Sequence, residues 1–322
     1  MRAVVMREFG PPEVLQLAEV PDPEPGPGQV VIDVRFSSVT FVETQVRAGR
    51  PPNPRMRPEL PAILGNGVGG VVSAVGQEAP GDLLGRFVIA SLGGTGGYAE
   101  RAVIAAGRVV EIPELALLRD ATALLADGRT AVGLTRRAAI RAGETVLVEA
   151  AAGGVGTLLV QLAKNAGARV VALAGEERKL AVARDLGADL AFSYASADWA
   201  DAVHAATGGV DVVFDGVGGQ TGITAFGLLE PGGRFVPFGM ASGAFATVPA
   251  DVARRRRIAV LAAAPPTAYE MHQYTAAALA EAVAGRLRPV FGQVHALADA
   301  AHAHAAIEGR QTIGKTLLGS PS

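Results

Sequence analysis

A strand-like run, a glycine-rich turn and a helical pattern follow one another near the middle of this chain, and they constrain its fold most strongly. Residues 145–149 form a short, mostly apolar and β-branched run, which is typical of a buried parallel strand. The next seven residues, 150–156, contain three glycines, and leucines at helical spacing follow over 157–166. A second apolar run covers 169–173. The pattern predicts a complete strand–helix–strand unit.

The glycine turn of this unit is suited to binding a dinucleotide. A pyrophosphate must approach the backbone closely, where a Cβ atom would collide, and it must lie over the exposed N–H groups at a helix start. The flanking strand and helix supply the context that such a motif requires. The residues expected to bind the pyrophosphate are Ala152, Gly153, Gly154, Val155 and Gly156. A tight turn without a ligand is the alternative interpretation.

The residues after the second strand indicate which dinucleotide is bound. NAD-specific sites usually place an acidic residue at the end of this strand, where it binds the ribose 2′-hydroxyl. Here the strand ends at Gly175, and Arg178 and Lys179 follow, which favours the 2′-phosphate of NADPH. Glu176 would oppose NADPH if its side chain pointed toward the phosphate. A solvated helix face is the alternative for the two cations.

Composition excludes several classes of function. The chain has 322 residues, enough for two domains, and its net charge of −2 gives no electrostatic reason to expect nucleic acid or an acidic membrane as a partner. It has no cysteine, which excludes disulfides, cysteine-ligated zinc and a thiol nucleophile. No signal peptide or membrane-spanning stretch is recognisable, so we expect a cytoplasmic protein.

The pattern of apolar and turn-forming residues changes near residue 120. Residues 1–120 consist of short strand-like runs separated by proline and glycine turns, which predicts a compact antiparallel domain. Beyond this point apolar strands alternate with helices, the pattern of a doubly wound parallel sheet. The last strand of that sheet is expected over 258–262, and a helix over 269–284.

Motifs along the whole chain share one resemblance. They are MRAVVMREFGPPEVL at the start, the segment 39–49, GYAE at 97–100, the glycine turn, DVVFDGVGG at 211–219, LEPGGRFVPFG at 229–239 and the closing Gly314-Lys315. Together they resemble the medium-chain dehydrogenase/reductase superfamily, in particular its zinc-free quinone oxidoreductase (zeta-crystallin-like) group.

The resemblance implies an α/β fold in two domains. A Rossmann doubly wound parallel sheet, residues 121–286, would be inserted in a mostly antiparallel β (GroES-like) catalytic domain made of residues 1–120 and 287–322. Members of the group usually form homodimers through an edge strand of the Rossmann sheet, which would be 258–262 here.

The resemblance also implies further cofactor contacts. Thr130 matches a family threonine near the cofactor, and the loops containing Val217, Phe238, Gly239 and Met240 would approach the nicotinamide. The alternatives are a hydroxyl that caps the start of a helix for Thr130 and ordinary strand-to-helix turns for the loops.

The chain departs from the group at the substrate end. Where the group typically has an Asn–Asp pairing and a nearby Gly-x-Tyr, this chain has Thr40 and Glu43, then Gly49-Arg50-Pro51, and the usual Glu near residue 65 is replaced by Gly67. The catalytic candidates are therefore Thr40, Glu43 and Arg50, and the Arg50 guanidinium is suited to an anionic or carbonyl-bearing substrate.

Each catalytic candidate also has a structural interpretation. Thr40 would lie in a turn at a strand end, Glu43 would pair with Arg47 on a short helix, and Arg50 would lie on the surface. All five histidines lie at or beyond His204, so residues 1–120 offer zinc neither imidazole nor thiolate, and no metal is expected.

The sequence thus favours an NADPH-dependent oxidoreductase that transfers hydride to a small-molecule substrate, a quinone or an α,β-unsaturated carbonyl, without zinc. One alternative is a specialised enoyl reductase or cyclase-like enzyme of a biosynthetic pathway. Another is a non-catalytic NADPH-binding protein, in which the arginine run 254–257 would contact nucleic-acid phosphates. A solvated loop is the favoured interpretation of that run, because no aromatic residues accompany it.

Overall fold

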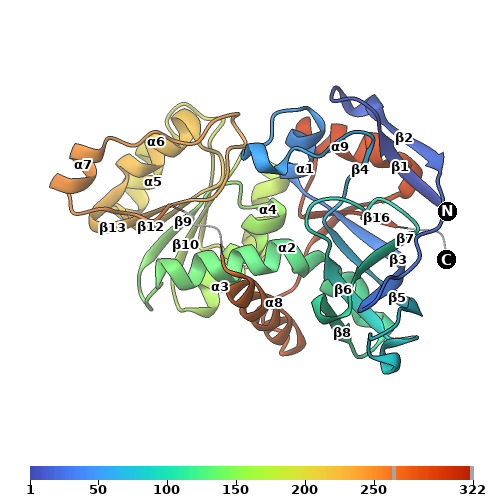
Figure 1. The fold of residues 1–322 in the computed structure, drawn as a ribbon. Helices are drawn as coiled ribbons and strands as arrows, with labels where there is room; N and C mark the ends of the chain where they lie inside the picture. The colour runs from blue at the N-terminus through green and yellow to red at the C-terminus, as the bar shows by residue number, and fades with distance from the viewer. Residues whose placement is uncertain (263–265, 320–322) are drawn as a thin grey trace. The chain divides into compact units, whose positions relative to one another are not determined.

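The chain divides into two compact units. In the computed structural model, residues 1–262 and 266–319 are described. One unit comprises Met1–Ala126 and Phe291–Ser322, and the other comprises Asp127–Val290 (Figure 1). The corresponding predicted boundaries lie after residues 120 and 286, and the last three residues of the predicted segment 287–322 lie outside the described residues.

The first unit is built from short strands and few helices. In chain order these are β1 (Arg2–Met6), η1 (Pro12–Val14), β2 (Leu15–Glu19), β3 (Gln29–Val39), α1 (Phe41–Arg47), η2 (Pro54–Met56), β4 (Ala62–Ile63), β5 (Gly67–Val75), η3 (Gly81–Leu83), β6 (Phe87–Ser91), β7 (Arg101–Ala105), η4 (Ala106–Arg108), β8 (Val109–Ile112), the beginning of α2 (Leu115–Ala138), β15 (Phe291–Ala296), η5 (Leu297–Asp299), α9 (Ala300–Glu308) and β16 (Lys315–Gly319).

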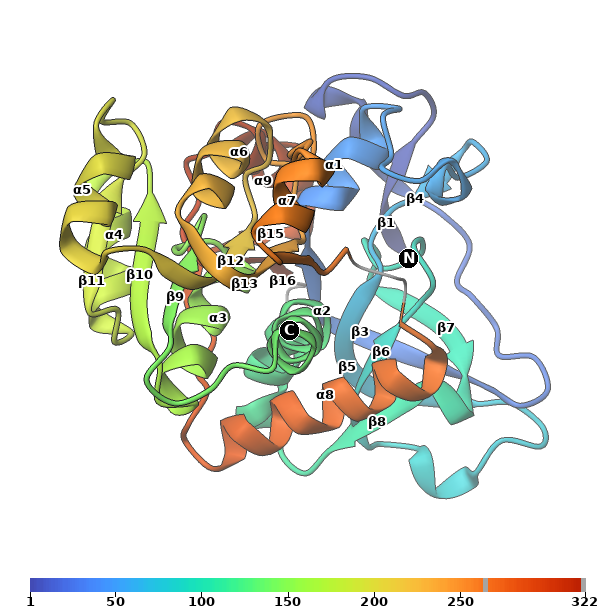
Figure 2. The same ribbon diagram turned by 90° about the vertical axis from the view of Figure 1, so that its left-hand side faces the viewer.

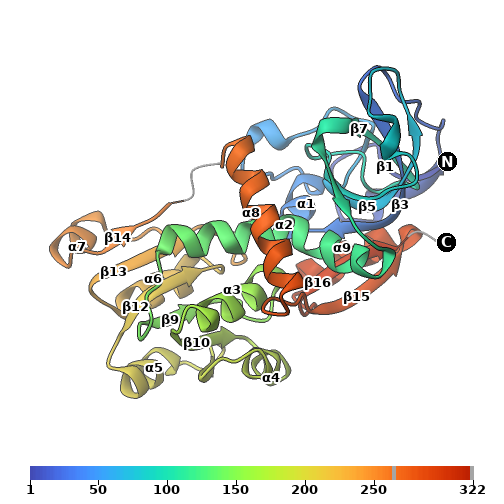
Figure 3. The same ribbon diagram turned by 90° about the horizontal axis from the view of Figure 1, so that it is seen from below.

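The sheets of this unit are antiparallel except for one pair of strands. The larger sheet has the order β15-β16-β3-β5-β6-β8, with β7 also pairing β3, and a smaller one has the order β2-β1-β4. Only β15 and β16 run parallel within these sheets, in the described part of the chain. β16 lies against β3, far away in sequence, as Figure 3 shows. The predicted antiparallel domain is thus confirmed, with both ends of the chain in it.

Residues from the two ends of the chain share one core. Val4 and Met6 of β1 pack in the same buried cluster as Tyr98, Ala300 and Ala303. Burying an apolar side chain of the size of Val4 or Met6 stabilises a fold by about 1.5–3 kcal/mol. The segment after residue 290 therefore completes the core that β1 begins.

The second unit alternates strands and helices. Its elements are the end of α2, β9 (Thr145–Val148), α3 (Gly154–Asn165), β10 (Arg169–Ala174), α4 (Glu177–Asp185), β11 (Leu190–Ser193), α5 (Trp199–Thr207), β12 (Val210–Asp215), α6 (Gly219–Gly227), β13 (Leu229–Pro237), α7 (Ala250–Arg255), β14 (Ala259–Val260) and α8 (Ala268–Val283).

All neighbouring strands of this unit run parallel. Their order is β11-β10-β9-β12-β13-β14, and Figure 2 shows β11 to β13 side by side. The chain moves outward from β9 to β11, then returns to place β12 on the other side of β9. This is the predicted doubly wound sheet, and the order reverses between β9 and β12, where such sheets bind their ligands.

One face of the parallel sheet is covered by α5 and α6. Leu147 of β9 and Val213 of β12 share a buried cluster with Trp199 and Val203 of α5 and Phe226 of α6. Because strand side chains alternate between faces, residues 149 and 215 point to this same side. Helices α5 and α6 therefore cover the side chains of residues 149 and 215 on that face.

Some element boundaries differ from the prediction. Among the short strand-like runs of the first domain, β3 is longer than the others and reaches Val39, where Ser37 and Ser38 are buried in the sheet and the Ser37 hydroxyl donates to the Gly97 carbonyl (2.5 Å). The edge strand predicted over 258–262 is only Ala259–Val260. In the two described stretches, 1–262 and 266–319, none of the helices combines the length and apolar character needed to cross a membrane.

Candidate active site

The glycine turn is closed by backbone hydrogen bonds. The Gly153 N–H donates to the Ala150 carbonyl (2.8 Å), and the Ala151 N–H donates to the Leu173 carbonyl of the neighbouring strand (3.0 Å). A Cβ atom on Gly156 would lie 2.1 Å from the Ala150 oxygen. The packing of the turn against the helix therefore leaves room only for glycine at position 156.

The glycine turn leads directly into α3, and the first backbone N–H groups of this helix are available to a ligand. Gly153 is the N-cap and has no side chain to satisfy them. The N–H groups of Gly154, Val155 and Gly156 have no partner within the helix, and they lie at the positive end of its dipole. Gly153, Gly154 and Val155 are partly exposed, whereas Ala152 is buried beneath them. The five residues predicted to bind a pyrophosphate thus form one cradle that suits an anion.

The end of β10 carries a small cluster of charges. Glu176 pairs with Arg178 Nε (2.7 Å) and with Lys179 Nζ (3.6 Å). The hydrogen bond from Arg178 and the charge of Lys179 lower the pKa of the exposed Glu176 carboxyl. The acid that the sequence analysis treated as an obstacle is therefore paired with both predicted phosphate ligands, and the cluster keeps one net positive charge.

An aromatic residue that sequence reasoning missed lies beside this cluster. Tyr194 follows β11, and its ring Cε2 lies 3.3 Å from the position that a Cβ on Gly175 would occupy. β11 pairs with β10 in parallel, so the two strand ends meet at one edge of the sheet. That adjacency is the signal that would have found Tyr194 from the predicted strands.

Two loops at the ends of β12 and β13 are joined by their backbones. The N–H groups of Phe238 and Gly239 donate to the Asp215 carbonyl (2.9 and 3.1 Å), and the Ser242 N–H donates to the Val217 carbonyl (2.8 Å). The predicted nicotinamide-side residues Val217, Phe238 and Gly239 therefore belong to one paired loop structure.

Glycine is required for the two loops to lie this close. A Cβ on Gly239 would lie 2.4 Å from the Gly216 oxygen, and a Cβ on Gly216 would lie 2.7 Å from the Phe238 ring. Met240, the fourth predicted residue, continues the same loop and is partly exposed.

Two buried acids that sequence reasoning did not single out lie under these loops. Glu149 follows β9 and Asp215 ends β12, and both side chains are fully buried. Burial and the neighbouring Asp215 carboxyl raise the pKa of Glu149 well above its ordinary value. Carboxyl groups buried without a cation are unusual enough to require an explanation.

Thr130 lies in the interior of α2, which starts at Leu115, and its side chain is exposed. The alternative that Thr130 caps the start of a helix is therefore wrong, because the alanine- and leucine-rich residues before it are already helical.

In the first unit, Thr40 and Glu43 are bonded to each other. Thr40 is the N-cap of α1, and both its N–H (2.7 Å) and its hydroxyl (3.0 Å) donate to Glu43 Oε2. The other oxygen, Oε1, accepts the Asn66 N–H (2.8 Å). Arg47 instead binds Glu308 (2.5 Å) and the Gly10 carbonyl (3.0 Å), so the alternative of a Glu43–Arg47 pair is wrong.

Glu43 is part of a longer buried chain of polar groups. The Tyr98 hydroxyl lies 3.2 Å from Glu43 Oε2 and 3.0 Å from His304 Nε2. Burial raises the pKa of Glu43 and of Tyr98, and it lowers the pKa of His304 to about 3. His304 is therefore neutral, and its Nε2–H donates to Tyr98 while Tyr98 donates to Glu43. No sequence spacing connects these three residues, which is why the sequence analysis did not bring them together.

Arg50 lies on an exposed turn just after α1. Gly49 takes a left-handed conformation (φ +74°), and the Arg50 N–H donates to the Gln45 carbonyl (2.8 Å). Arg57 stacks 3.9 Å from the centre of the Phe9 ring and donates to the Gly49 carbonyl (3.2 Å). Within the described residues, no hydrogen bond or ion pair engages the Arg50 side chain, so its guanidinium is available to a ligand.

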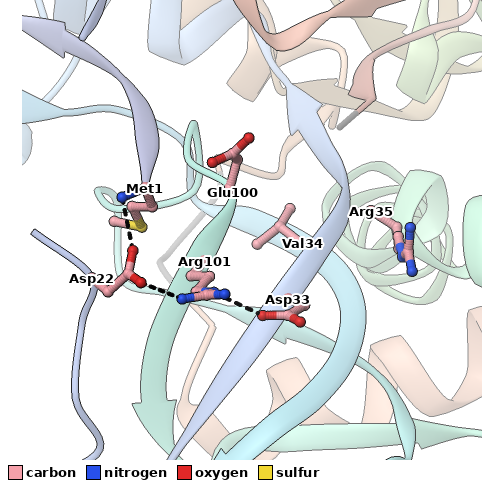
Figure 4. Close-up of a pocket in the computed structure, with 7 residues that line it drawn as sticks. All are labelled: Met1, Asp22, Asp33, Val34, Arg35, Glu100 and Arg101. Atoms are coloured by element: carbon pink, nitrogen blue, oxygen red, sulfur yellow. Dashed lines mark hydrogen bonds and ion pairs between the residues drawn. The ribbon is translucent and has the colours of Figure 1, made fainter. Parts of the chain in front are cut away.

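A separate charged pocket of about 390 Å³ lies in the first unit. Its lining includes the Met1 amine, Asp22, Asp33 and Arg101, drawn in Figure 4. Asp22 pairs with the Met1 amine (2.7 Å) and with Arg101, which also pairs with Asp33 (3.1 Å). None of the predicted site residues lines this pocket. The Met1 amine, Asp22, Arg101 and Asp33 form one chain of ion pairs in it, while Glu100 pairs with Arg2 outside the lining.

No group of three or more His, Cys, Asp or Glu side chains is arranged to hold a metal ion anywhere in residues 1–262 or 266–319.

Comparisons with known proteins match both units. The family model described as alcohol dehydrogenase GroES-like domain matches residues 26–114, and the one described as zinc-binding dehydrogenase matches residues 154–281. Human quinone oxidoreductase is 34% identical over 99% of this chain and 97% of its own length. A 2-haloacrylate reductase from a Burkholderia species is 32% identical over 98% of each chain.

Solved structures give the same result for the fold. The Escherichia coli quinone oxidoreductase complexed with NADPH superposes with a TM-score of 0.90 at 28% identity, over 99% of this chain and 100% of that chain. The quinone oxidoreductase from Thermus thermophilus, solved alone and with NADPH, gives a TM-score of 0.85 at 33% identity, with the same coverage.

Proposed function

The chain belongs to the quinone oxidoreductase group of the medium-chain dehydrogenase/reductase superfamily, and from this membership we propose that it is an NADPH-dependent oxidoreductase acting on quinones or α,β-unsaturated carbonyls without zinc. The observation that best supports this proposal is the glycine cradle at the start of α3. Its packing is so close that a Cβ on Gly156 would lie 2.1 Å from the Ala150 oxygen. When bound, NADPH supplies the hydride. The residues of the chain bind it, orient it and recognise the acceptor.

The second unit provides groups for each part of NADPH. The amides of Gly154, Val155 and Gly156 would bind the pyrophosphate through the positive end of α3. Arg178 and Lys179 would bind the 2′-phosphate, with the Tyr194 ring beside them against Gly175.

The nicotinamide end would lie against the paired loops that contain Val217, Phe238, Gly239 and Met240. These loops leave the carboxyl ends of their strands beside the point where the strand order reverses, which supports the assignment. Thr130 remains a proposed contact from α2, since its side chain is exposed.

In the first unit, Thr40 and Arg50 are the proposed substrate-binding groups, and Glu43 positions Thr40. The Thr40 hydroxyl donates to Glu43 (3.0 Å), so it must turn away from Glu43 to donate to a substrate carbonyl. Glu43 keeps three further donors, from the Thr40 backbone, Asn66 and Tyr98, whatever the hydroxyl does. The carboxyl group can therefore hold the end of β3 in place while the hydroxyl changes partner.

Arg50 extends the proposed substrate range to anionic alkenes. The Burkholderia relative is named a 2-haloacrylate reductase, and a haloacrylate carries a carboxylate next to its double bond. An exposed guanidinium is suited to binding such a carboxylate. Substrates with a carboxylate beside the reducible bond therefore belong in the first assays, together with neutral quinones.

The test separates binding from turnover. The purified protein is titrated with NADPH and with NADH by fluorescence, and then a 1,4-quinone, an alkenal and an acrylate are added while cofactor absorbance is followed. We expect tight NADPH binding and oxidation by at least one acceptor. Binding without oxidation would support a non-catalytic role instead, and failure to bind either cofactor would overturn the proposal.

Gly156→Val and Gly227→Ala serve as matched variants. A side chain at 156 meets the Ala150 oxygen, whereas a Cβ at position 227 of α6 meets no atom within 4 Å. We expect Gly156→Val to abolish NADPH binding and Gly227→Ala to retain it. Full activity of Gly156→Val would contradict the placement of the cofactor.

We also propose a cytoplasmic homodimer joined through β14. This edge strand pairs only with β13 among the described strands, and Val260 on it is 41% exposed. Sedimentation of the protein and of Val260→Lys tests the dimer, and an unchanged sedimentation coefficient in the variant would contradict it. Cell fractionation tests the location.

A further inference from the structure

Glu149 and Asp215 are held side by side by the register of the parallel sheet. Val148 and Phe214 are partners in the neighbouring strands β9 and β12, and the Glu149 N–H donates to the Phe214 carbonyl (3.0 Å). Glu149 and Asp215 are the next residue of each strand, so their side chains leave the sheet on the same face. They do so where the strand order reverses, directly beneath the loop that follows β12.

Each carboxyl group holds one amide of that loop. Glu149 Oε2 accepts the Val217 N–H (3.1 Å), and Asp215 Oδ1 accepts the Gly218 N–H (2.6 Å). Both acids are 0% exposed. Their remaining oxygens, Glu149 Oε1 and Asp215 Oδ2, are buried and have no hydrogen-bond partner within the described structure.

One shared proton would satisfy the two remaining oxygens. Two adjacent carboxylates in a buried site cannot both be ionised at low cost, so one of them keeps its proton. If that proton lies between the two side chains, one oxygen gains a donor role and the other gains an acceptor role. Burial and the side-chain interaction with Asp215 both raise the pKa of Glu149, in agreement with this arrangement.

The surroundings determine which acid is neutral. Asp215 lies at the start of α6, receives the shorter amide bond, and occupies space left open by Gly222, where a Cβ would lie 2.6 Å from Oδ2. The positive end of a helix favours a carboxylate at that place. Glu149 receives only the longer bond from Val217. Among the described residues, Asp215 on β12 is the one charged group acting on Glu149, while the loop and α6 present backbone amides and Gly222.

We propose that Glu149 is a neutral carboxylic acid that donates a hydrogen bond to the Asp215 carboxylate, and that this pair positions the 216–219 loop for the nicotinamide end of the dinucleotide. The inference deepens the proposed function and rests on it for the identity of the ligand. Glu149 and Asp215 are positioning residues, because they act through the loop amides.

The Glu149–Asp215 pair is connected by backbone hydrogen bonds to the second nicotinamide-side loop, which contains Phe238 and Gly239. The Asp215 carbonyl accepts the N–H groups of Phe238 and Gly239, and the Gly219 N–H donates to the Ala244 carbonyl (3.0 Å). Removal of the shared proton leaves two buried negative charges in contact, which drives the carboxyl groups apart. Because both loops are bonded to the strand end that carries Asp215, both would shift, and NADPH affinity should fall at alkaline pH.

Two substitutions at Glu149 distinguish a shared proton from simple packing. In Glu149→Gln the amide carbonyl accepts the Val217 N–H and the NH₂ group donates to Asp215, with no proton to lose. In Glu149→Leu both bonds are absent. Glu281→Gln, near the end of α8 where Glu281 is partly exposed and pairs with Arg286, is the control for loss of a carboxylate far from the pair in sequence.

The first measurement is the Kd for NADPH from neutral to alkaline pH. We expect the Kd of the unmodified protein and of Glu281→Gln to rise by roughly tenfold or more, because the buried hydrogen bond between Glu149 and Asp215 is lost when Glu149 loses its proton. Kd of Glu149→Gln should stay constant over this range, and Glu149→Leu should bind roughly tenfold more weakly at every pH.

The second measurement is the infrared spectrum of the protein without any cofactor. The C=O stretch of a buried protonated carboxylic acid should be present in the unmodified protein and absent in Glu149→Gln. Parallel pH profiles of the unmodified protein and Glu149→Gln would overturn the positioning role, and absence of the carbonyl band would overturn the shared proton. If NADPH does not bind at any pH, the proposed function fails, while the carbonyl band still decides whether the proton is shared.

Discussion

The Tyr98 hydroxyl donates a hydrogen bond to Glu43 Oε2 over 3.2 Å, although 55 residues separate the two in sequence. The same hydroxyl accepts from His304, which arrives from the far end of the chain. Three titratable side chains in one buried chain of bonds make the first unit sensitive both to substitution and to pH.

Tyr98→Phe should destabilise the protein by about 1–3 kcal/mol, because it leaves the buried His304 Nε2–H without an acceptor and takes one donor from Glu43. Denaturant unfolding measures the loss. The control is Tyr269→Phe, since Tyr269 is 73% exposed and its substitution should have little effect. Equal stability of the two variants would contradict the bonding assigned to Tyr98.

His304 should destabilise the fold in acid. Its pKa is about 3 in the folded protein and near 6.5 when unfolded, so the unfolded state gains a proton first as pH falls. The stabilisation is complete above pH 6.5 and decreases by about 1.4 kcal/mol for each pH unit below it, down to pH 3.

Unfolding of the protein and of His304→Gln between about pH 7 and pH 4 tests this contribution. The raised pKa of Glu43 acts in the opposite direction in this range, because the folded state then gains the proton first. The difference between the two curves isolates His304, and a difference that does not change with pH would argue against a neutral buried imidazole.

Glu149→Gln should gain stability relative to the unmodified protein as pH rises. The folded pKa of Glu149 is raised, so its favourable contribution is complete below the unfolded value of 4.5 and is lost as pH rises toward the folded pKa. An amide at this position has no such dependence. Urea unfolding at acid and alkaline pH checks the sign, and a gain that is larger in acid would show that the assignment is reversed.

Arg178→Ala and Lys179→Ala should each weaken NADPH binding by roughly tenfold and leave NADH binding nearly unchanged, since each removes one charge-assisted bond to the 2′-phosphate. Glu176→Gln should strengthen NADPH binding, because Glu176 competes for both cations. Parallel fluorescence titrations with the two cofactors measure the preference. If NADH and NADPH affinities fell together, the cluster would not be the phosphate site.

Arg50→Ala should raise KM for a carboxylate-bearing acrylate by roughly tenfold and change KM for a neutral quinone little, because only the acrylate pairs with the guanidinium. Arg55→Ala, a neighbouring exposed arginine on η2, is the matched control. A similar effect of Arg50→Ala on both substrates would exclude recognition of the carboxylate by Arg50.

The parts of the fold that follow from local patterns were predictable from the sequence. The glycine turn, its helix and the alternation of strands and helices that makes the parallel sheet depend on apolar runs and glycines that are close together along the chain. The placement of Gly156 followed from the same pattern.

The polar networks were not predictable, because tertiary packing creates them. The structural alternative for Glu43 was a pair with its helical neighbour Arg47, yet Arg47 binds Glu308 and Glu43 accepts a hydrogen bond from Tyr98. Glu149 looked like the end of an apolar strand, and only the pairing of β9 with β12 places it against Asp215. Sequence spacing carries no information about partners that adjacent strands bring together.

The late addition of β16 to β3 has a consequence for synthesis on the ribosome. Thr316 pairs with Val39, and Leu318 joins the core begun by Val4. The whole of residues 127–290 is translated between these partners and is contiguous, so it can fold as a unit while the first unit still lacks its central strand neighbour. Until residue 319 has emerged, residues 36–39 of β3 lack their strand partner, and this unpaired edge of the nascent chain is open to pairing with other strands.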